Sequence, residues 1–531
     1  MKRVVSLMLA VVMALGAFTG CGKTEKTSGD KKTLTVGMPQ GTSVTSYEDN
    51  AYTRYFEESL NIDIEFVLFS SGSEAMNQLS LMCAAGDELP DVLIGFSNMS
   101  TLMMVQYGED GFLLELSDLI EKYGENFKAQ MDKLPKDERE RVERSMSNVD
   151  TGEIYGMPLY SAVTVNDYSQ EMMNINTKWL SAVGMQAPKN VTELYEVLKA
   201  FKEEDPNGNG MEDELPLLSP NVYRYIVNAF VYYDSKRPLN IADGKVLSPT
   251  ISEENRQSLV YIRKLYEEGL INFSISENDA KNTISGDGTT AKVGIWSGNP
   301  LLRATYRTQV LDQYEVLEPL ADETGKGGYL VQWPRDLLLS GFITKDCEDT
   351  ELAMQFLDFC YKDESVTRAR HGEKGVYWEE ADEAQPTVYG TESKIKVLNA
   401  DVYSETDTRW GVYMPSIYTD DNYHAISKES EGSGSAAESA RLNRVHTEIM
   451  KTWRKPEETV AALPFNVEEQ QKLEKMGATI LSTITDYFAL FITGELDPTD
   501  DADWKEYLDK MEKSGLSEQI KIYQKAYDRS K

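Results

Sequence analysis

The chain has 531 residues, of which 10% are aromatic, with 54 basic and 88 acidic side chains and a net charge of −34. This length predicts two or more domains. The aromatic content indicates a folded globular chain rather than a disordered acidic one. The strong negative charge argues against nucleic acid as a partner, because phosphates repel such a surface.

The first twenty residues have the pattern of a bacterial export signal. The basic start Met1-Lys2-Arg3 precedes an apolar stretch from Val4 to Phe18, which is too short to cross a bilayer as a helix. Cys21 follows a small residue and is therefore predicted to carry a lipid anchor, although Phe18 stands where leucine is commoner. The alternative is ordinary cleavage that leaves Cys21 as a thiol. A lipid would hold the protein at the cell membrane, facing the extracellular side.

Removal of residues 1–20 would leave 52 basic and 88 acidic side chains, a net charge of −36. The polar stretch 21–33 is predicted to be a flexible tether, with folding beginning near Leu34. Three more cysteines remain, an odd number at spacings that fit neither a disulfide framework nor a zinc site. We expect all three to be buried thiols: Cys83, Cys347 and Cys360.

The folded part begins with strands that alternate with helices. Residues 34–38 and 61–69 have strand patterns, a helical stretch begins near Tyr52 between them, and residues 89–95 form a third short β run. Strand, helix and strand in this order make a βαβ unit, which builds parallel sheets.

The same alternation continues along the chain. Asn190-Val191-Thr192-Glu193 resembles a capping box, and apolar residues at helical spacing follow it through Phe201. A second helical pattern, residues 352–359, comes just after a β-like run at residues 337–344. The sequence therefore predicts an α/β protein. Residues 428–439, rich in Ser, Gly and Glu, are predicted to be a surface loop.

A loop after the first of these helices carries oxygen atoms at alternate positions, with Gly210 where a tight loop needs a relaxed backbone. Calcium takes 6–8 oxygen ligands, and alternate residues of a coiled loop can converge on one ion. The predicted ligands are the side chains of Asp205, Asn207, Asn209, Asp213 and Glu214 and the carbonyl of Met211.

The first nine positions of this loop follow the calcium loop of EF-hands, but Pro216 occupies the twelfth, where an EF-hand has a bidentate glutamate. The alternative is an exposed Asx- and Gly-rich turn without metal. Three carboxylates in so short a loop repel one another unless a cation is present, so we predict a structural calcium ion.

Several further motifs occur in a specific order: residues 85–92 (AGDELPDV), 152–158 (GEIYGMP), 176–180 (NTKWL), 491–495 (FITGE) and 523–529 (YQKAYDR). With the Asp205 loop between them, they resemble the extracellular solute-binding proteins of ABC importers. The similarity is to the lipoprotein branch of Gram-positive bacteria that handles oligosaccharides, and it covers nearly all of the mature chain.

The resemblance implies two α/β lobes of the type II periplasmic-binding-protein-like fold, each discontinuous in sequence and joined by a hinge that closes on ligand. The first lobe is expected to comprise residues 34–160 and 340–410, and the second residues 161–339 and 411–531. The family also implies a monomer that delivers its solute to ABC permease subunits, with calcium at the Asp205 loop in some relatives.

The resemblance further implies a carbohydrate ligand in the cleft between the lobes. Sugar sites pair aromatic rings with planar polar groups. Trp296 ends a β-like run at a Gly/Pro loop and matches a cleft position of the family; the alternative is a core tryptophan. Trp179 and Trp504 sit in helical patterns and are predicted to be core. The other candidate ligand-binding residues are Trp333, Trp378, Trp410, Tyr160, Phe96, Asn98, Asn299 and Arg335.

Two other functions stay open. A surface glycosidase would need two carboxylates about 5 to 9 Å apart, but 88 acidic residues supply such pairs by chance. With three histidines and no His-Glu-x-x-His, Gly-x-Ser-x-Gly or phosphate-binding glycine loop, the sequence predicts no enzyme. The second alternative is a binding protein for a peptide, nucleoside or other non-sugar solute.

Overall fold

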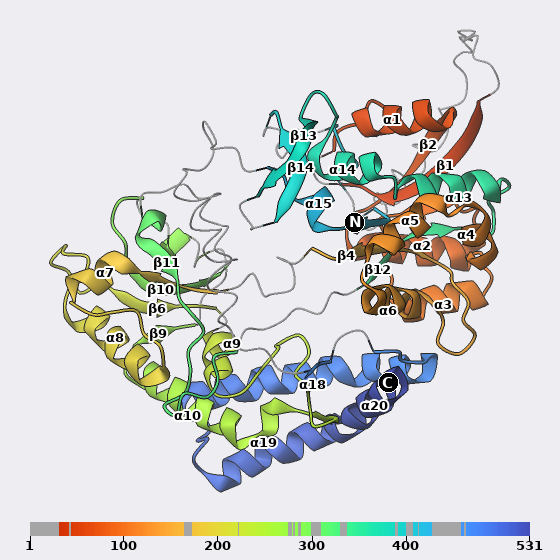
Figure 1. Ribbon diagram of the computed structural model, residues 1–531. Helices are drawn as coiled ribbons and strands as arrows, with labels where there is room; N and C mark the ends of the chain where they lie inside the picture. The colour runs from red at the N-terminus through yellow and green to blue at the C-terminus, as the bar shows by residue number, and fades with distance from the viewer. Residues whose placement is uncertain are drawn as a thin grey trace, which may run out of the picture.

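The computed structural model places most of the chain in two α/β lobes that lie side by side (Figure 1). It describes residues 31–41, 44–163, 172–220, 222–273, 279, 282–284, 288–298, 310–329, 337–387, 391–399, 407–411, 414–426, 458–460 and 463–531. The predicted export signal, Cys21 and the Ser/Gly-rich segment 428–439 lie outside these ranges.

The first lobe is built on a six-stranded sheet with the order β15-β4-β12-β3-β1-β2. Its strands are β1 (Lys32–Pro39), β2 (Ile62–Phe69), β3 (Val92–Ile94), β4 (Met157–Ser161), β12 (Leu338–Ile343) and β15 (Ser416–Tyr418). β1 pairs in parallel with β2 over its whole length and with β3 on its other side. β12 is antiparallel to both β3 and β4.

Helices cover this sheet, and one hairpin projects from the lobe (Figure 1). The helices are α1 (Ala51–Leu60), α2 (Ser73–Ala85), α3 (Thr101–Glu109), α4 (Ser117–Tyr123), α5 (Glu125–Lys133), α6 (Lys136–Met146), α13 (Thr350–Phe359), α14 (Asp363–His371) and α15 (Asp420–Tyr423). The hairpin consists of β13 (Trp378–Pro386) and β14 (Glu392–Val397).

Trp410 lies at the centre of the first lobe's aromatic core. Its ring centroid is 5.0 Å from that of Tyr52, 5.1 Å from that of Phe56 and 6.2 Å from that of Phe356. Its indole nitrogen donates a hydrogen bond to Thr53 Oγ1 at 2.8 Å. One side chain therefore joins α1, α13 and the segment 407–411, which are far apart in sequence.

The second lobe is built on a five-stranded sheet with the order β11-β5-β10-β6-β9. Its strands are β5 (Met172–Asn176), β6 (Leu215–Leu218), β9 (Ile271–Asn272), β10 (Val293–Gly298) and β11 (Tyr314–Val316). The three-stranded sheet β16-β7-β8 is separate and consists of β7 (Asn240–Ala242), β8 (Lys245–Leu247) and β16 (Glu458–Thr459).

The helices of the second lobe are α7 (Thr177–Ala182), α8 (Val191–Glu203), α9 (Val222–Ile226), α10 (Glu253–Glu267), α18 (Val467–Thr493), α19 (Asp501–Lys513) and α20 (Leu516–Ser530). Short 3₁₀ turns occur at Val227–Ala229, Pro249–Ile251 and Leu311–Gln313. The predicted core residues Trp179 and Trp504 are buried in this lobe, as expected from their helical patterns.

α18 connects the two lobes. Val467, its first residue, packs against the first lobe's core, and the Ser100 hydroxyl donates to Glu474 Oε1 at 3.4 Å. Further along, residues from Ile480 to Ile492 enter the core of the second lobe. α18 is the one described helix long and apolar enough to cross a membrane, but its buried apolar face identifies it as a helix of this folded lobe.

The local predictions for the first strands and helices are confirmed. β1, β2 and β3 lie where the alternating patterns indicated, with α1 and α2 between them. Asn190 caps α8 by accepting from the amide of Glu193 at 2.9 Å. The Glu193 carboxylate accepts from the backbone amide of Lys189 at 2.8 Å and from the side-chain amide of Asn190 at 3.0 Å, but not from the backbone amide of the cap residue, so only half of the capping box forms.

The predicted end of the first lobe at residue 410 is wrong. β15 pairs in parallel with β4, with Ser416 opposite Leu159, so it is an edge strand of the first sheet. α15 then packs against β14 and α14 of the same lobe. Residues 414–426 therefore belong to the first lobe, because a short strand is stabilised only where it finds a partner, and here that partner is β4.

Candidate functional site

In each large sheet, the strands terminate at one end of the sheet that lies beside the chain crossings between the lobes. We call this end the edge of the sheet. β1 and β3 end at this edge of the first sheet, where the antiparallel β12 begins and β4 ends at Ser161. The chain enters the second sheet at Met172, at the edge where β6 and β10 end. In open α/β sheets, ligands bind outside the carboxyl ends of the strands, so the space between these edges is the candidate site.

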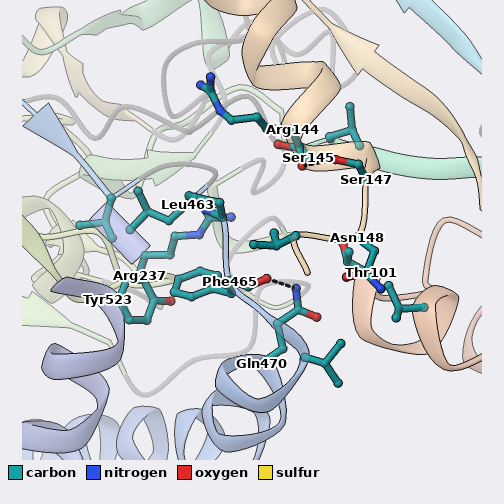
Figure 2. A pocket seen from close by; sticks show the side chains of 16 residues that line it. Thr101, Arg144, Ser145, Ser147, Asn148, Arg237, Leu463, Phe465, Gln470 and Tyr523 are labelled. Carbon is teal, nitrogen blue, oxygen red and sulfur yellow. Dashed lines mark hydrogen bonds between the residues drawn. The ribbon is translucent and has the colours of Figure 1, made fainter. Parts of the chain in front are cut away.

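A pocket of about 220 Å³ lies between the lobes and is lined by residues of both (Figure 2). We call it the interlobe pocket. Leu337, which precedes β12, places it beside a chain crossing. Polar and charged side chains from both lobes face it: Thr101, Arg144, Ser145, Ser147 and Asn148 from the first, and Arg237, Gln470 and Tyr523 from the second.

The start of α18 forms one wall of the interlobe pocket. Gln470 turns back and donates to the Phe465 carbonyl at 3.4 Å, the bond drawn in Figure 2. Asn466 caps this helix, and its amide in turn donates to Glu469 Oε2 at 3.1 Å, which completes a capping box. Hydrogen bonds at the N-terminus of α18 thus hold this wall of the pocket in place, while Val467 contacts the first lobe.

The prediction that exposed indole rings form the recognition surface is wrong for the three described candidates. Trp296, Trp378 and Trp410 are 3%, 3% and 1% exposed. Trp296 lies on the central strand β10 and packs edge-on against Tyr314, with ring centroids 6.1 Å apart. A large ring at such a position is more stable inside the core, where it removes apolar area from water.

The remaining candidates have different environments. Tyr160 and Phe96 are each 1% exposed, and their contact with a solute stays a prediction. The Tyr160 hydroxyl is bonded to Arg141 and donates to Glu138 Oε2 at 3.3 Å. Asn98 is exposed in the loop between β3 and α3, at the candidate edge. Trp333, Asn299 and Arg335 lie outside the described residues.

Sequence reasoning missed the polar residues of the interlobe pocket and a hydroxyl pair at the second sheet's edge. Ser219 and Ser297 follow β6 and end β10, and their Oγ atoms are 2.5 Å apart. A serine that ends a strand before a proline or glycine is a weak signal for such an edge. Arg144 and Arg237 have no signal in the sequence, since only the packing of the lobes brings them to one pocket.

The Asp205 loop brings several of its predicted calcium ligands together. The Asp205 carboxylate accepts from the amides of Asn209 at 3.2 Å and Gly210 at 2.9 Å. Asp205 has φ 47° and Gly210 φ 75°, so the loop coils tightly. The side-chain amides of Asn207 and Asn209 reach Asp213 Oδ1 at 3.3 and 2.9 Å.

The two carboxylates at the end of this loop differ in their electrostatics. A hydrogen bond from Lys292, whose Nζ is 2.7 Å from Asp213 Oδ2, and another from Asn209 lower the pKa of Asp213. Burial raises the pKa of Glu214, and the neighbouring carboxylates of Asp205 and Asp213 add to the rise. Glu214 Oε1 is buried without a hydrogen-bond partner among the described residues, and such an oxygen fits a cation.

In the described part of the chain, the Asp205 loop included, no group of three or more His, Cys, Asp or Glu side chains is placed to hold a metal ion. A cation at the Asp205 loop would therefore need amide and carbonyl oxygens beside its carboxylates, which calcium accepts.

The described cysteine thiols and histidine rings are buried. The thiols of Cys83, Cys347 and Cys360 are buried and unpaired, as predicted. Burial raises the pKa of all three, that of Cys347 to about 12, so they stay protonated at neutral pH. Burial, with a smaller contribution from the charge of Arg370, lowers the pKa of His371 to about 3.

The sequence profile of the bacterial extracellular solute-binding protein family matches residues 39–367. The chain belongs to this family. Its members bind solutes and are not enzymes, in agreement with the absence of a catalytic motif from the sequence.

Two curated relatives are similar to the chain over half of its length or more. The fructooligosaccharide ABC transporter substrate-binding protein FusA of Streptococcus pneumoniae serotype 4 is 25% identical over 500 residues, which cover 89% of this chain and 85% of FusA. Lipoprotein LipO of Bacillus subtilis is 26% identical over 288 residues, which cover 52% of each chain.

Solved structures share the two-lobe fold. An extracellular solute-binding protein from Bifidobacterium longum subsp. infantis has a TM-score of 0.76 at 21% identity, covering 94% of this chain and 98% of its own. An EF-hand mutant of FusA in complex with fructo-nystose has a TM-score of 0.71 at 21% identity, covering 94% and 99%. The two-lobe periplasmic-binding-protein-like fold is thereby confirmed.

Proposed function

We propose that this chain captures an oligosaccharide between its two lobes and delivers it unaltered to the permease of an ABC importer. The observation that carries this proposal is the similarity to FusA over 89% of the chain. The geometry supports it, because a pocket with polar walls from both lobes lies between them, beside a chain crossing.

The chemistry of the interlobe pocket fits a hydroxylated solute. Arginine, asparagine, glutamine, serine and tyrosine offer both donors and acceptors in fixed directions. With Trp296, Trp378 and Trp410 buried, recognition would depend on these polar groups and on smaller apolar side chains such as Val105 and Leu463, and less on ring stacking.

A thermal-shift screen of the chain without residues 1–21 tests this function. The panel contains oligosaccharides, including kestose, together with peptides and nucleosides. A solute that binds only the folded state at a hundredfold excess over its dissociation constant stabilises the protein by about 2.7 kcal/mol. Stabilisation by a peptide or nucleoside, with none by any oligosaccharide, would identify the other class of solute. Product analysis of the same mixtures detects any turnover.

We also propose that the protein is lipid-anchored through Cys21 and works as a monomer on the extracellular side of the membrane. LipO supports the anchor because its name describes a lipoprotein. Replacing Cys21 by Ala should release the protein into the medium while leaving its solute binding unchanged. A Cys21→Ala protein that stays with the membrane fraction would show that another element anchors it.

Calcium at the Asp205 loop is a third part of the proposal. The ligands would be Asp205, Asn207, Asn209, the Met211 carbonyl, Asp213 and Glu214. The orphaned Glu214 oxygen and the inward coiling of the loop support it, and FusA is itself described as having an EF-hand. The ion would hold the turn between α8 and β6 and neutralise its carboxylates, without contact with the solute.

A further inference from the structure

A second hollow, of about 820 Å³, lies entirely within the first lobe. One face of α5, the start of α14, α15 and the β13–β14 hairpin surround it, and these elements are neighbours in Figure 1. We call it the hairpin groove. Because no residue of the second lobe lines it, its shape does not depend on how the lobes are arranged. Pockets of this size accommodate small solutes.

Gln130 on α5 lines the hairpin groove and carries a buried acceptor. The side chain is 2% exposed, and its amide nitrogen donates to the Tyr361 carbonyl at 2.8 Å and to Asp363 Oδ1 at 2.7 Å. These two acceptors fix the orientation of the amide, since a flipped amide would set its oxygen against both. Gln130 Oε1 then has no donor among the described residues.

Such an acceptor is costly to bury without a partner. An occupant of the groove that carries a hydroxyl or N–H group would supply the missing donor. Asn126 and Asn422 line the groove too, and their side-chain amides donate within the lobe, to Asp358 Oδ2 at 2.7 Å and to the Ile417 carbonyl at 3.1 Å.

The charges of the groove are nearly balanced, in contrast to the chain as a whole. Four lysines and five carboxylates line it, whereas the whole chain carries −34. Lys133 is paired with Asp363, and Lys374 with Glu380 at 3.5 Å. Paired ammonium and carboxylate groups attract neither a cationic nor an anionic ligand strongly. They offer donors and acceptors side by side, which suits an uncharged solute rich in hydroxyl groups.

Trp378 supplies an aromatic surface at the base of the hairpin. Its indole nitrogen donates to the Gly372 carbonyl at 2.9 Å, and Lys374 Nζ lies 5.2 Å from its ring centroid. The ring is therefore fixed in place, and it lines the groove with 3% of its surface exposed. An indole beside amides and ion pairs combines an apolar surface with donors and acceptors, and a sugar ring has the same combination in its C–H surface and hydroxyl belt.

We propose that the hairpin groove is a second binding site, for a short uncharged saccharide, separate from the space between the lobes. The choice of a saccharide among hydroxylated solutes rests on the proposed function. Gln130 Oε1 accepts a hydroxyl of the bound sugar, the paired charges bind further hydroxyls, and the C–H surface of the sugar packs against Trp378.

Fluorine NMR of the chain without residues 1–21, labelled with 5-fluorotryptophan, tests this site directly. Each of the seven tryptophans gives a resonance, and the variant Trp378→Phe identifies the one in the groove. Titration with kestose, maltotriose and cellotriose should move the Trp378 resonance saturably with at least one of them. Gln130→Met should weaken this response about tenfold, as expected for one lost hydrogen bond.

Gln355→Met is the matched control, because Gln355 is an exposed glutamine on α13 that does not line the groove. It should leave the titration unchanged. A Trp378 resonance that no sugar moves, while the thermal screen still detects an oligosaccharide, overturns the second site and leaves the proposed function intact. A shift caused by glycine betaine and by none of the sugars overturns the class of solute. A saccharide response that survives Gln130→Met overturns the assigned contact.

Discussion

The two lobes use the late part of the chain in different ways. In the first lobe, residues after 337 enter the sheet itself, since β12 lies between β3 and β4, and β15 extends the edge at β4. In the second lobe, the five-stranded sheet is complete by Val316, and the C-terminal residues add the helices α18, α19 and α20 around it.

The residues after 337 therefore take part in different interactions in the two lobes. The first lobe needs them for backbone hydrogen bonds within its sheet and for the aromatic core around Trp410, which bonds to a residue 357 positions away. The second needs them mainly to cover its five-stranded sheet with apolar side chains, and only the short β16 adds a strand, to the separate sheet at β7. We therefore expect the stability of the first lobe to be more sensitive to changes in the residues after 337. We also expect the loss of chain entropy on loop closure to be larger when this lobe folds.

The largest expected effect is that of Trp410→Ala. Truncating a fully buried tryptophan removes its contacts and leaves a cavity, which costs about 3–5 kcal/mol. Trp504→Ala is the matched change in the second lobe, where Trp504 is 7% exposed and packs 5.1 Å from Tyr507. It should cost less, because that site can admit water. Hydrogen exchange followed by mass spectrometry reports the lobes separately, and faster exchange of the second lobe in Trp410→Ala would contradict the comparison.

Removal of calcium should affect the second lobe alone. A chelator should lower its stability by about 2–3 kcal/mol if the cation had been present at a hundredfold excess over its dissociation constant. Asp205→Asn should abolish the response to chelator, whereas Asp243→Asn should retain it. Asp243 is a suitable control because it too has a positive φ, 50°, in a turn of the same lobe. An unchanged melting temperature with chelator would indicate the plain turn.

Acid should destabilise the first lobe through His371. Its pKa is lowered from 6.5 to about 3, first by burial and then by the charge of Arg370, so the folded state keeps the ring neutral while the unfolded state takes up a proton. The stabilisation is fully present above about pH 6.5 and is lost as pH falls toward 3, by up to about 1.4 kcal/mol per pH unit. Urea unfolding between pH 7 and 4.5 measures this slope.

His371→Gln is the variant that tests the assignment, since glutamine retains a donor for the Tyr423 carbonyl, which lies 3.3 Å from His371 Nε2. The variant should flatten the slope between pH 6.5 and 4.5. If the variant and the unmodified protein lose stability equally over this range, other groups are responsible.

The smallest expected effect is that of Glu469→Gln at the α18–α20 contact. Glu469 forms a two-bond pair with Arg529, at 2.9 and 3.0 Å, and is largely buried. Its loss should cost about 1 kcal/mol in thermal unfolding. The adjacent Glu468→Gln breaks an exposed pair with Lys472 and should leave the melting temperature unchanged. Equal effects of the two variants would show that burial does not strengthen the pair with Arg529.

Local features could be predicted because their causes are local. Asn190 caps α8 through an amide three residues away, and the Asp205 loop coils through hydrogen bonds that span two to five residues. The alternating pattern of residues 34–38 specifies a strand wherever its partner lies, and β1 forms there. The buried state of the three thiols followed from their spacing and number.

The site could not be predicted in the same way. A tryptophan at a strand end has the same sequence pattern whether its ring faces a cleft or a core, and Trp296 proved to be core. Arg144 and Arg237 line one pocket although their neighbours in sequence give no sign of it.

By itself, the sequence determined the α/β class, the order of the early strands and helices, the coiled Asp205 loop and the family to which the chain belongs. The tertiary structure alone decided that residues 414–426 complete the first sheet, which rings are buried, and which polar groups meet between the lobes. The physical reason is range: caps, turns and periodicity depend on neighbours within a few residues. Burial and strand pairing depend instead on contacts such as that between β4 and β15, which only the folded chain brings together.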